Sequence, residues 1–224
     1  MNETKATTRW MAVVGAVLGL MGLGSVGAWA ADPVASNNSG VFTVRITPNV
    51  DLGVTVDTTG AAWTADTDLD VDMDLSAEKL LGTGVKLTVA GNFQNQEFQL
   101  TGAVLDTWTL DTDESVEGDK LRLYGKIGTD QNADLALTGD FTATTDLITT
   151  VATRAGQPEA DEAANANHTY EFATAAGARY QDVDGMAVAQ ARRLWLRANT
   201  PNTTTVDAQQ RFTVTVTAVT GAGL

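Results

Sequence analysis

The chain has 224 residues, with 28 acidic and 14 basic residues, one histidine and no cysteine, and its formal net charge is −14. The lack of cysteine excludes disulfides and thiolate metal sites, and the single His168 excludes a multi-histidine metal centre. The negative charge argues against nucleic-acid binding, because phosphate backbones are negative as well.

The first 30 residues have the organisation of a secretory signal peptide. Lys5 and Arg9 give a basic start, residues 11–23 are almost uninterrupted apolar, and Ala28-Trp29-Ala30 places small residues where a signal peptidase cleaves. These features predict cleavage after Ala30 and export. The alternative is an uncleaved anchor, because residues 10–31 approach the ~20 residues that span a bilayer. We expect no membrane span after cleavage, since no second apolar stretch of that length follows.

The exported part of the chain has the composition and periodicity of β-strands. After Ala30 it holds 31 Thr and four Ser; β-branched threonine suits a pleated, half-exposed surface, whereas serine favours caps and loops. Apolar and polar residues alternate over residues 41–46, 51–57 and 211–218, which is the period of a strand with one buried face. Further strands are predicted at residues 69–75, 85–90, 97–101, 108–111, 120–127, 133–141, 169–174 and 191–197.

Turn residues separate these strands, for example Gly91-Asn92, Gly118-Asp119 and Asp184-Gly185. About ten short strands with few helical stretches predict an all-β fold, an antiparallel β-sandwich of Ig-like or jelly-roll type. The predicted organisation is a signal peptide at residues 1–30, an N-terminal segment at 31–48 and one sandwich domain at 49–224. Two smaller sandwiches are the alternative. Within the domain, residues 142–189 are expected to form a long loop or insertion, with a short helix at 158–165.

Five aspartates occupy every second position over residues 66–74, a run that overlaps the strand predicted at residues 69–75. If the strand forms, their carboxylates project from one face about 7 Å apart, and their repulsion must be offset by water and salt, by a basic neighbouring strand or by Ca²⁺. The EF-hand template does not fit, because loops begun at Asp66 or Asp70 place Val71 or Leu75 where glycine is required. A solvated acidic face, with no cofactor, is the favoured interpretation, and a different kind of Ca²⁺ site is the alternative. The candidate ligands are Asp66, Asp68, Asp70, Asp72 and Asp74.

Catalytic motifs are sparse, which predicts a protein that is not an enzyme. His168 lies in a polar run, and no G-x-S-x-G or nucleotide-binding glycine motif occurs. A pair of carboxylates as in glycosidases leaves no spacing signature and stays open. Trp108 and Trp195 are predicted to fill the core, whereas Trp63 is placed either in the core or on an exposed face that stacks on a glycan.

Charge is unevenly distributed along the chain. Residues 66–119 hold 13 acids and two bases, whereas residues 179–211 hold five arginines and three aspartates. Opposite charges of this kind pair either within one molecule, which is the favoured interpretation, or head-to-tail between molecules.

The C-terminal third carries a resemblance to a known group of proteins. The run 193–197 (RLWLR), followed by Thr200-Pro201 and by residues 209–218, resembles the ending of small secreted β-sandwich proteins of bacterial envelopes. The Gly91-Asn92 turn ahead of Phe98, Leu100 and Trp108 is similar to their middle strands. The resemblance covers roughly half of the exported chain. It implies an exported structural or surface role and carries over no catalytic residues.

The predicted function is that of a secreted structural protein of the cell surface or extracellular space, a filament or surface-layer subunit. Residues 31–40 lead into residues 41–46, where Phe42, Val44 and Ile46 share one face and are suited to join the sheet edge of a neighbour. The alternative is that this strand pairs within its own sheet. Expected partners are further copies or other surface proteins, and the periplasm is the alternative location. A secreted carbohydrate- or calcium-binding module, with a glycan as partner, is the alternative function.

Overall fold

The computed structural model describes residues 45–113, 117–131, 137–141, 145–156, 169–172, 179 and 181–221. The chain divides into two compact units, residues 1–48 and 49–224. Several predictions concern residues outside the described ones: the signal peptide, the helix at 158–165, and the side chains of Phe42, Val44 and His168.

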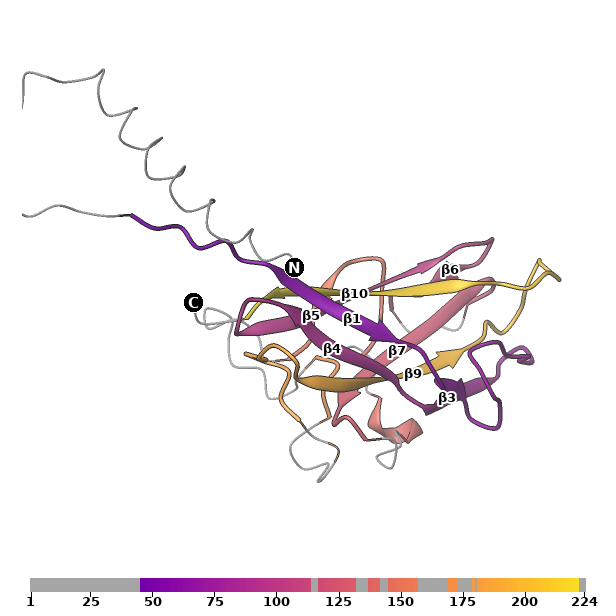
Figure 1. Cartoon of the computed structure of the whole chain (residues 1–224). Coiled ribbons are helices and arrows are strands. Elements are labelled where there is room, and N and C mark those ends of the chain that lie inside the picture. The colour runs from indigo at the N-terminus through magenta and orange to yellow at the C-terminus, as the bar shows by residue number, and fades with distance from the viewer. Residues whose placement is uncertain are drawn as a thin grey trace, which may run out of the picture. The chain divides into compact units, whose positions relative to one another are not determined.

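The described part of the chain is all-β and contains the 3₁₀ turn η2 (Thr138–Asp140). No helix within the described ranges is long and apolar enough to cross a membrane. Figure 1 shows the arrangement of the strands. They are β1 (Leu52–Asp57), β2 (Ala62–Trp63), β3 (Glu78–Thr83), β4 (Val85–Gly91), β5 (Gln96–Val104), β6 (Thr109–Leu110), β7 (Lys120–Gly128), β8 (Thr153–Arg154), β9 (Ala191–Asn199) and β10 (Phe212–Thr220).

β9 lies at the centre of the larger sheet. One of its edges pairs antiparallel with β7, from Arg122↔Asn199 to Gly128↔Arg193. Its other edge pairs with β4 and then with β3, two strands that are separated by Gly84 alone. β1 pairs antiparallel with the outer edge of β4, β2 pairs with β3, and β6 pairs in parallel with β7.

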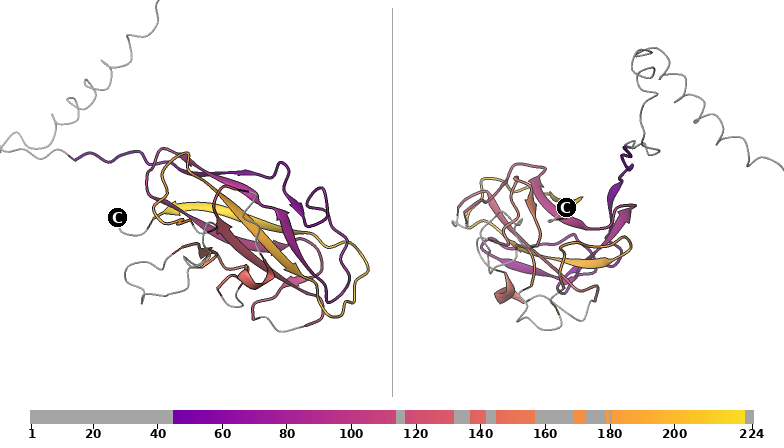
Figure 2. Two further views of the ribbon diagram at one scale, coloured as in Figure 1. Left: turned by 90° about the horizontal axis from the view of Figure 1, so that it is seen from below. Right: turned by 90° about the vertical axis from the view of Figure 1, so that its left-hand side faces the viewer.

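The smaller sheet consists of β10, β5 and β8, in that order. β5 pairs antiparallel with β10 from Phe212↔Val104 to Thr220↔Gln96, and with β8 along its other edge. The two sheets curl around one hydrophobic core (Figure 2). This shared core follows from the alternation of apolar and polar residues in the sequence, which places the apolar side chains of each strand on one face. Leu87 of β4 and Leu100 of β5, both 0% exposed, are examples that face the same interior.

The stretch predicted as a long loop or insertion, residues 142–189, is irregular in its described parts apart from β8 and isolated bridges. It nevertheless supplies apolar side chains to the core, so its described residues help to cover the two sheets. The buried side chains from this stretch are Leu147, Ile148, Ala155, Tyr170, Phe172, Val183 and Met186.

The predicted strand at residues 69–75 is wrong, because the chain between β2 and β3 is irregular. Trp63 holds the start of this segment: its indole N–H donates to the carbonyl of Leu69 at 2.9 Å, and its backbone N–H donates to the carbonyl of Asp68 at 3.1 Å. The Asp68 carboxylate accepts the backbone N–H of Asp70 at 2.9 Å. Such local side-chain bonds compete with sheet pairing. The predicted strand at 133–141 is also wrong in its described part, which contains η2.

Gly91 is required by the turn between β4 and β5. Its φ is +83°, and an added Cβ would lie 2.2 Å from the carbonyl oxygen of Asp51. Because the left-handed conformation alone costs a residue with a side chain roughly 1–2 kcal/mol, we expect Gly91→Ala to lower the free energy of unfolding by at least about 2 kcal/mol in urea denaturation. Gly139→Ala is the control, since nothing lies within 4 Å of its added Cβ. Equal losses for the two variants would contradict this explanation.

Candidate functional site

Two neighbouring strands, one from each sheet, have an edge that no described strand covers. β1 pairs with β4 alone, and β10 pairs with β5 alone. The two strands lie next to each other, yet no ladder joins them (Figure 1). We call these two uncovered edges the free edges of β1 and β10.

The core is incompletely covered along the free edges. The apolar residues of β10 that face the core, Phe212, Val214 and Val216, are only half-buried, and on β1 Val56 is 46% exposed. In contrast, Phe98 on the neighbouring β5 is 0% exposed. A further strand beside these residues would remove their apolar surface from water, which is favourable by about 25 cal/mol per Å².

The chain just before β1 is extended and exposed. Residues 45–50 contain neither a strand nor a turn, and Ile46 is 85% exposed. The Asn92 side chain fixes the start of β1: it accepts the backbone N–H of Asp51 at 2.8 Å and donates to the carbonyl of Asn49 at 3.1 Å. Of the three residues predicted to drive assembly, Ile46 is therefore solvent-exposed, and the other two lie outside the described residues.

The buried amide of Gln96 secures the same end of β1 from inside. Its Nε2 donates to the carbonyls of Ala90 and Phe93, both at 2.8 Å, and its Oε1 accepts the backbone N–H of Gly53 at 3.0 Å. Because the side chain is fully buried, each of these bonds forms in a low-dielectric environment. β1 is thus fixed to the turn between β4 and β5 close to the point where the N-terminal segment, residues 31–48, ends.

The five predicted metal ligands do not share one face of a strand. Asp66 forms an ion pair with Lys79 at 2.5 Å, Asp70 accepts the side-chain N–H of Gln209 at 3.0 Å, and Asp68 bonds to the backbone of Asp70. Their charges are thus offset in part by neighbouring protein groups. The remaining two, Asp72 and Asp74, are exposed, and Ca²⁺ binding by this segment stays a prediction.

A different set of carboxylates comes together in the irregular stretch of chain before β9. Oxygen atoms of Glu171, Asp182 and Asp184 lie within 4.8 Å of one another, and no other such group occurs among the described residues. Glu171 accepts the backbone N–H of Val183 at 2.6 Å, and Asp182 accepts that of Asp184 at 2.7 Å. Oxygen clusters of this kind suit hard cations. Sequence reasoning missed Glu171, because its distance along the chain from Asp182 matches no metal-binding motif.

The pKa of Glu171 is raised to about 8, chiefly by burial and also by Asp184 and Asp182, while the hydrogen bond from the Val183 N–H and the charge of Arg192 act to lower it. The folded protein therefore holds a proton that the unfolded chain releases between about pH 4.5 and 8. Stability is highest below that window, falls as pH rises through it and levels off above about 8. We expect Glu171→Gln to remove a loss on the order of 5 kcal/mol, measured by urea denaturation at several pH values.

The control for this variant is Asp72→Asn at an exposed position. We expect it to leave the loss of stability between pH 4.5 and 8 in place. If the Glu171→Gln variant loses as much stability across the window as the natural chain, Glu171 is not the group responsible.

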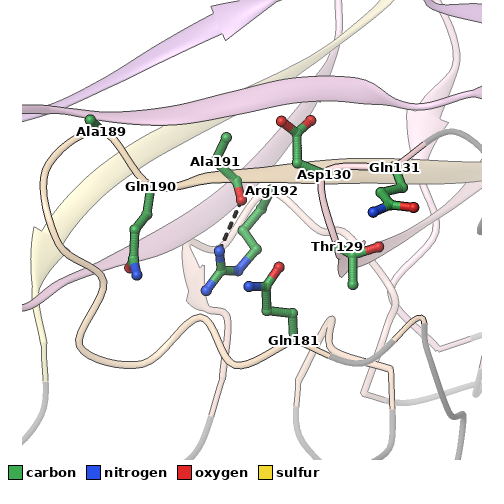
Figure 3. A pocket seen from close by; sticks show the side chains of 8 residues that line it. All are labelled: Thr129, Asp130, Gln131, Gln181, Ala189, Gln190, Ala191 and Arg192. Atoms are coloured by element: carbon green, nitrogen blue, oxygen red, sulfur yellow. Dashed lines mark hydrogen bonds between the residues drawn. The ribbon is translucent and has the colours of Figure 1, made fainter.

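An open polar depression of about 630 Å³ lies beside the end of β7 and the start of β9. Figure 3 shows the side chains of Gln181, Gln190 and Arg192 gathered in it. The Arg192 guanidinium donates to the backbone carbonyls of Asp182 and Ala191, so these N–H groups already have hydrogen-bond partners within the protein. The lining offers the hydroxyl of Thr129 and the side-chain amides of three glutamines for hydrogen bonding. Its residues are Thr129, Asp130, Gln131, Gln181, Ala189, Gln190, Ala191 and Arg192.

Two of the three tryptophan interpretations are decided by burial. Trp63 is 2% exposed and its indole N–H is used internally, so an exposed stacking platform at Trp63 is wrong. Trp195 is 1% exposed, which confirms its core position. Trp108 is half-buried and donates to the hydroxyl of Thr204 at 3.0 Å.

Two arginines of the basic C-terminal region pair with acids of the acidic region. Arg197 lies 3.1 Å from Glu78, and Arg211 lies 2.9 Å from Asp106. The interpretation that such charges pair within one molecule is thereby confirmed for these two arginines.

A scan against models of protein families and a search of curated proteins find no match to the chain. Functional conclusions therefore depend on the geometry. Of the features described above, the free edges combine half-buried apolar side chains with backbone that no described strand pairs, and these are the two properties that attract another strand.

Proposed function

We propose that the chain is an exported, non-enzymatic structural subunit of the cell surface or extracellular space, which assembles when residues 41–46 of one copy add to a sheet edge of the next. The observation that carries this proposal is the pair of free edges with half-buried apolar rows. In this interpretation the two sheets are a sandwich of Ig-like or jelly-roll type. Export follows from the predicted signal peptide.

Strand addition would use both the apolar face of the N-terminal segment and the uncovered sheet edge of the acceptor copy. An added strand gains main-chain hydrogen bonds, and its alternate side chains enter the core of the acceptor. Exposed Ile46, with Phe42 and Val44, supplies three apolar side chains on one face. Burying each of them is worth roughly 1.5–3 kcal/mol before the cost of ordering the segment.

Removing the segment tests the function. The chain from Ala31 and a shorter chain from Asn49 are purified, and their masses are followed by light scattering as concentration rises. We expect the longer chain to form polymers that are visible by electron microscopy and the shorter one to stay monomeric. The proposal is wrong if the longer chain stays monomeric and forms no fibres, or if the shorter chain polymerises equally well.

A carbohydrate- or calcium-binding module stays the alternative prediction. The cluster of Glu171, Asp182 and Asp184 is the observation in its favour, whereas the burial of Trp63 removes the proposed glycan platform. Calorimetry with Ca²⁺ and with a panel of glycans tests it. Absence of heat with every ligand, together with a melting temperature that Ca²⁺ does not raise, would eliminate this alternative.

A further inference from the structure

We propose that the free edge of β10 is the acceptor, and that its occupant is the segment of residues 41–46 from a second copy of the chain. This inference rests on the proposed function and names the surface at which assembly takes place. It is argued from the composition of β10, from the burial of its side chains and from the way the chain enters β1.

β10 lacks the usual protection of an exposed strand edge. Proteins protect such edges with short strands, charged residues, proline or bulges. β10 spans nine residues, FTVTVTAVT, without a charge, a proline or a glycine, and it pairs with β5 without a register shift. A long edge of this composition that remained uncovered would cause aggregation.

The other uncovered edges among the described strands are shorter or interrupted. β1 has six residues, contains Gly53 and ends at Asp57, whereas β2 and β8 have two residues each. β8 also carries Arg154, which forms an ion pair with Glu97 at 3.1 Å. Among these strands, β10 alone has an edge longer than the six residues of the segment.

The apolar pattern of the segment matches that of β10. Residues that lie opposite each other in adjacent strands point to the same face of the sheet. Phe42, Val44 and Ile46 therefore extend the half-buried row Phe212, Val214 and Val216. Thr43 and Arg45 then lie on the outer face, where Thr213 and Thr215 are exposed.

The start of β1 favours a neighbouring molecule as the source of the segment. To cover its own β10, the chain would have to reverse direction just before β1. Residues 45–50 contain no turn, and Asn92 bonds to the backbone N–H of Asp51 and to the carbonyl of Asn49. A reversal at residues 49–51 would break these hydrogen bonds, whereas a segment from a second copy leaves them intact.

The absence of cysteine makes disulfide trapping unambiguous. Two chains from Ala31 are prepared, one with Val44→Cys and an affinity tag and the other with Val214→Cys. They are mixed and oxidised, and cross-linked pairs are identified by mass. In adjacent strands, opposite Cβ atoms lie about 4.5–5.5 Å apart, which is close to disulfide geometry. Because the register of the segment is not fixed, Phe212→Cys and Val216→Cys are tested as well, and circular dichroism confirms that each variant folds.

Thr213→Cys and Thr215→Cys are the matched controls, since they lie on the same strand but on its exposed face. We expect Val44→Cys to cross-link at least tenfold more with a core-facing position than with either control. Equal yields on both faces would overturn the proposal. An internal disulfide in a monomer that carries both Val44→Cys and Val214→Cys would also overturn it, because the segment would then cover its own edge.

Failure of the acceptor and failure of the function give different results. If the chain from Ala31 polymerises without linking to any β10 position, or links to Val56→Cys of β1 instead, β10 is not the acceptor but assembly through the segment stands. If the chain from Ala31 does not polymerise at all, the proposed function fails and this inference fails with it.

Discussion

Lys126→Met should lower the free energy of unfolding by roughly 3–5 kcal/mol, the typical cost of leaving one charge of a buried pair without its partner. Lys126 lies in the middle of β7 and is 5% exposed, and its ammonium contacts the fully buried Asp146 at 2.9 Å. It also donates to the backbone carbonyl of Glu171 at 2.8 Å. One side chain thus links the larger sheet to two irregular segments that cover the core. Urea denaturation measures the loss.

Lys86→Met is the matched control, because Lys86 also lies on a central strand and forms an ion pair, with Asp130 at 2.6 Å. That pair is part-exposed, and exposed pairs contribute about 0–1 kcal/mol. A second variant, Lys126→Met with Asp146→Asn, should recover part of the stability by neutralising the buried carboxylate. If the two single variants lose equal stability, the buried pair does not have the structural importance argued for it.

Val44→Asp should abolish polymer formation by the chain from Ala31 at concentrations where the natural sequence polymerises. A carboxylate at this position would have to enter the core of the acceptor without a partner, at a cost of several kcal/mol. Since every 1.4 kcal/mol is a tenfold change in affinity, the concentration needed for assembly should rise at least about a hundredfold. Light scattering across a concentration series measures this threshold.

Thr43→Asp places the same charge on the opposite face of the same segment. We expect its assembly threshold to stay within about tenfold of the natural one, because the side chain remains in water. If both variants abolish assembly equally, the segment acts through its net charge rather than by placing alternate side chains in the core of a neighbour.

The strands predicted correctly are those in which alternation and burial agree. Residues 211–218 and 85–90 alternate strictly, and the structure has β10 and β4 there with core-facing apolar rows. Period-two patterns of this kind can be recognised from the local sequence, because a strand with one face buried and the other in water needs apolar and polar residues at alternate positions. The all-β class with antiparallel sheets follows from them.

The predictions failed where side chains bond to nearby backbone. The aspartates alternate as regularly as any strand, yet the Asp68 carboxylate and the Trp63 indole bind local backbone groups and keep the segment irregular. β3 (Glu78–Thr83) was missed for the opposite reason: its residues do not alternate, and it forms because β9 and β2 supply partners. Pairing of this kind depends on tertiary contacts and leaves no local pattern.

The candidate site, too, could be predicted only in part from the sequence. The alternating N-terminal segment can be recognised from the sequence, but the free edge that would receive it cannot, because strand order is not encoded locally. Likewise, the meeting of Glu171 with Asp182 and Asp184 depends on how the chain between β7 and β9 folds over the core. These two sites become visible only in three dimensions.

A high-resolution electron microscopy map of the polymer formed by the chain from Ala31 tests the central claim most directly. We expect density for residues 41–46 of one subunit beside β10 of the next, with Phe42, Val44 and Ile46 directed into the core of the acceptor. Subunits joined through other surfaces, with each N-terminal segment paired to its own sheet, would contradict it, and so would a chain that forms no polymer to image.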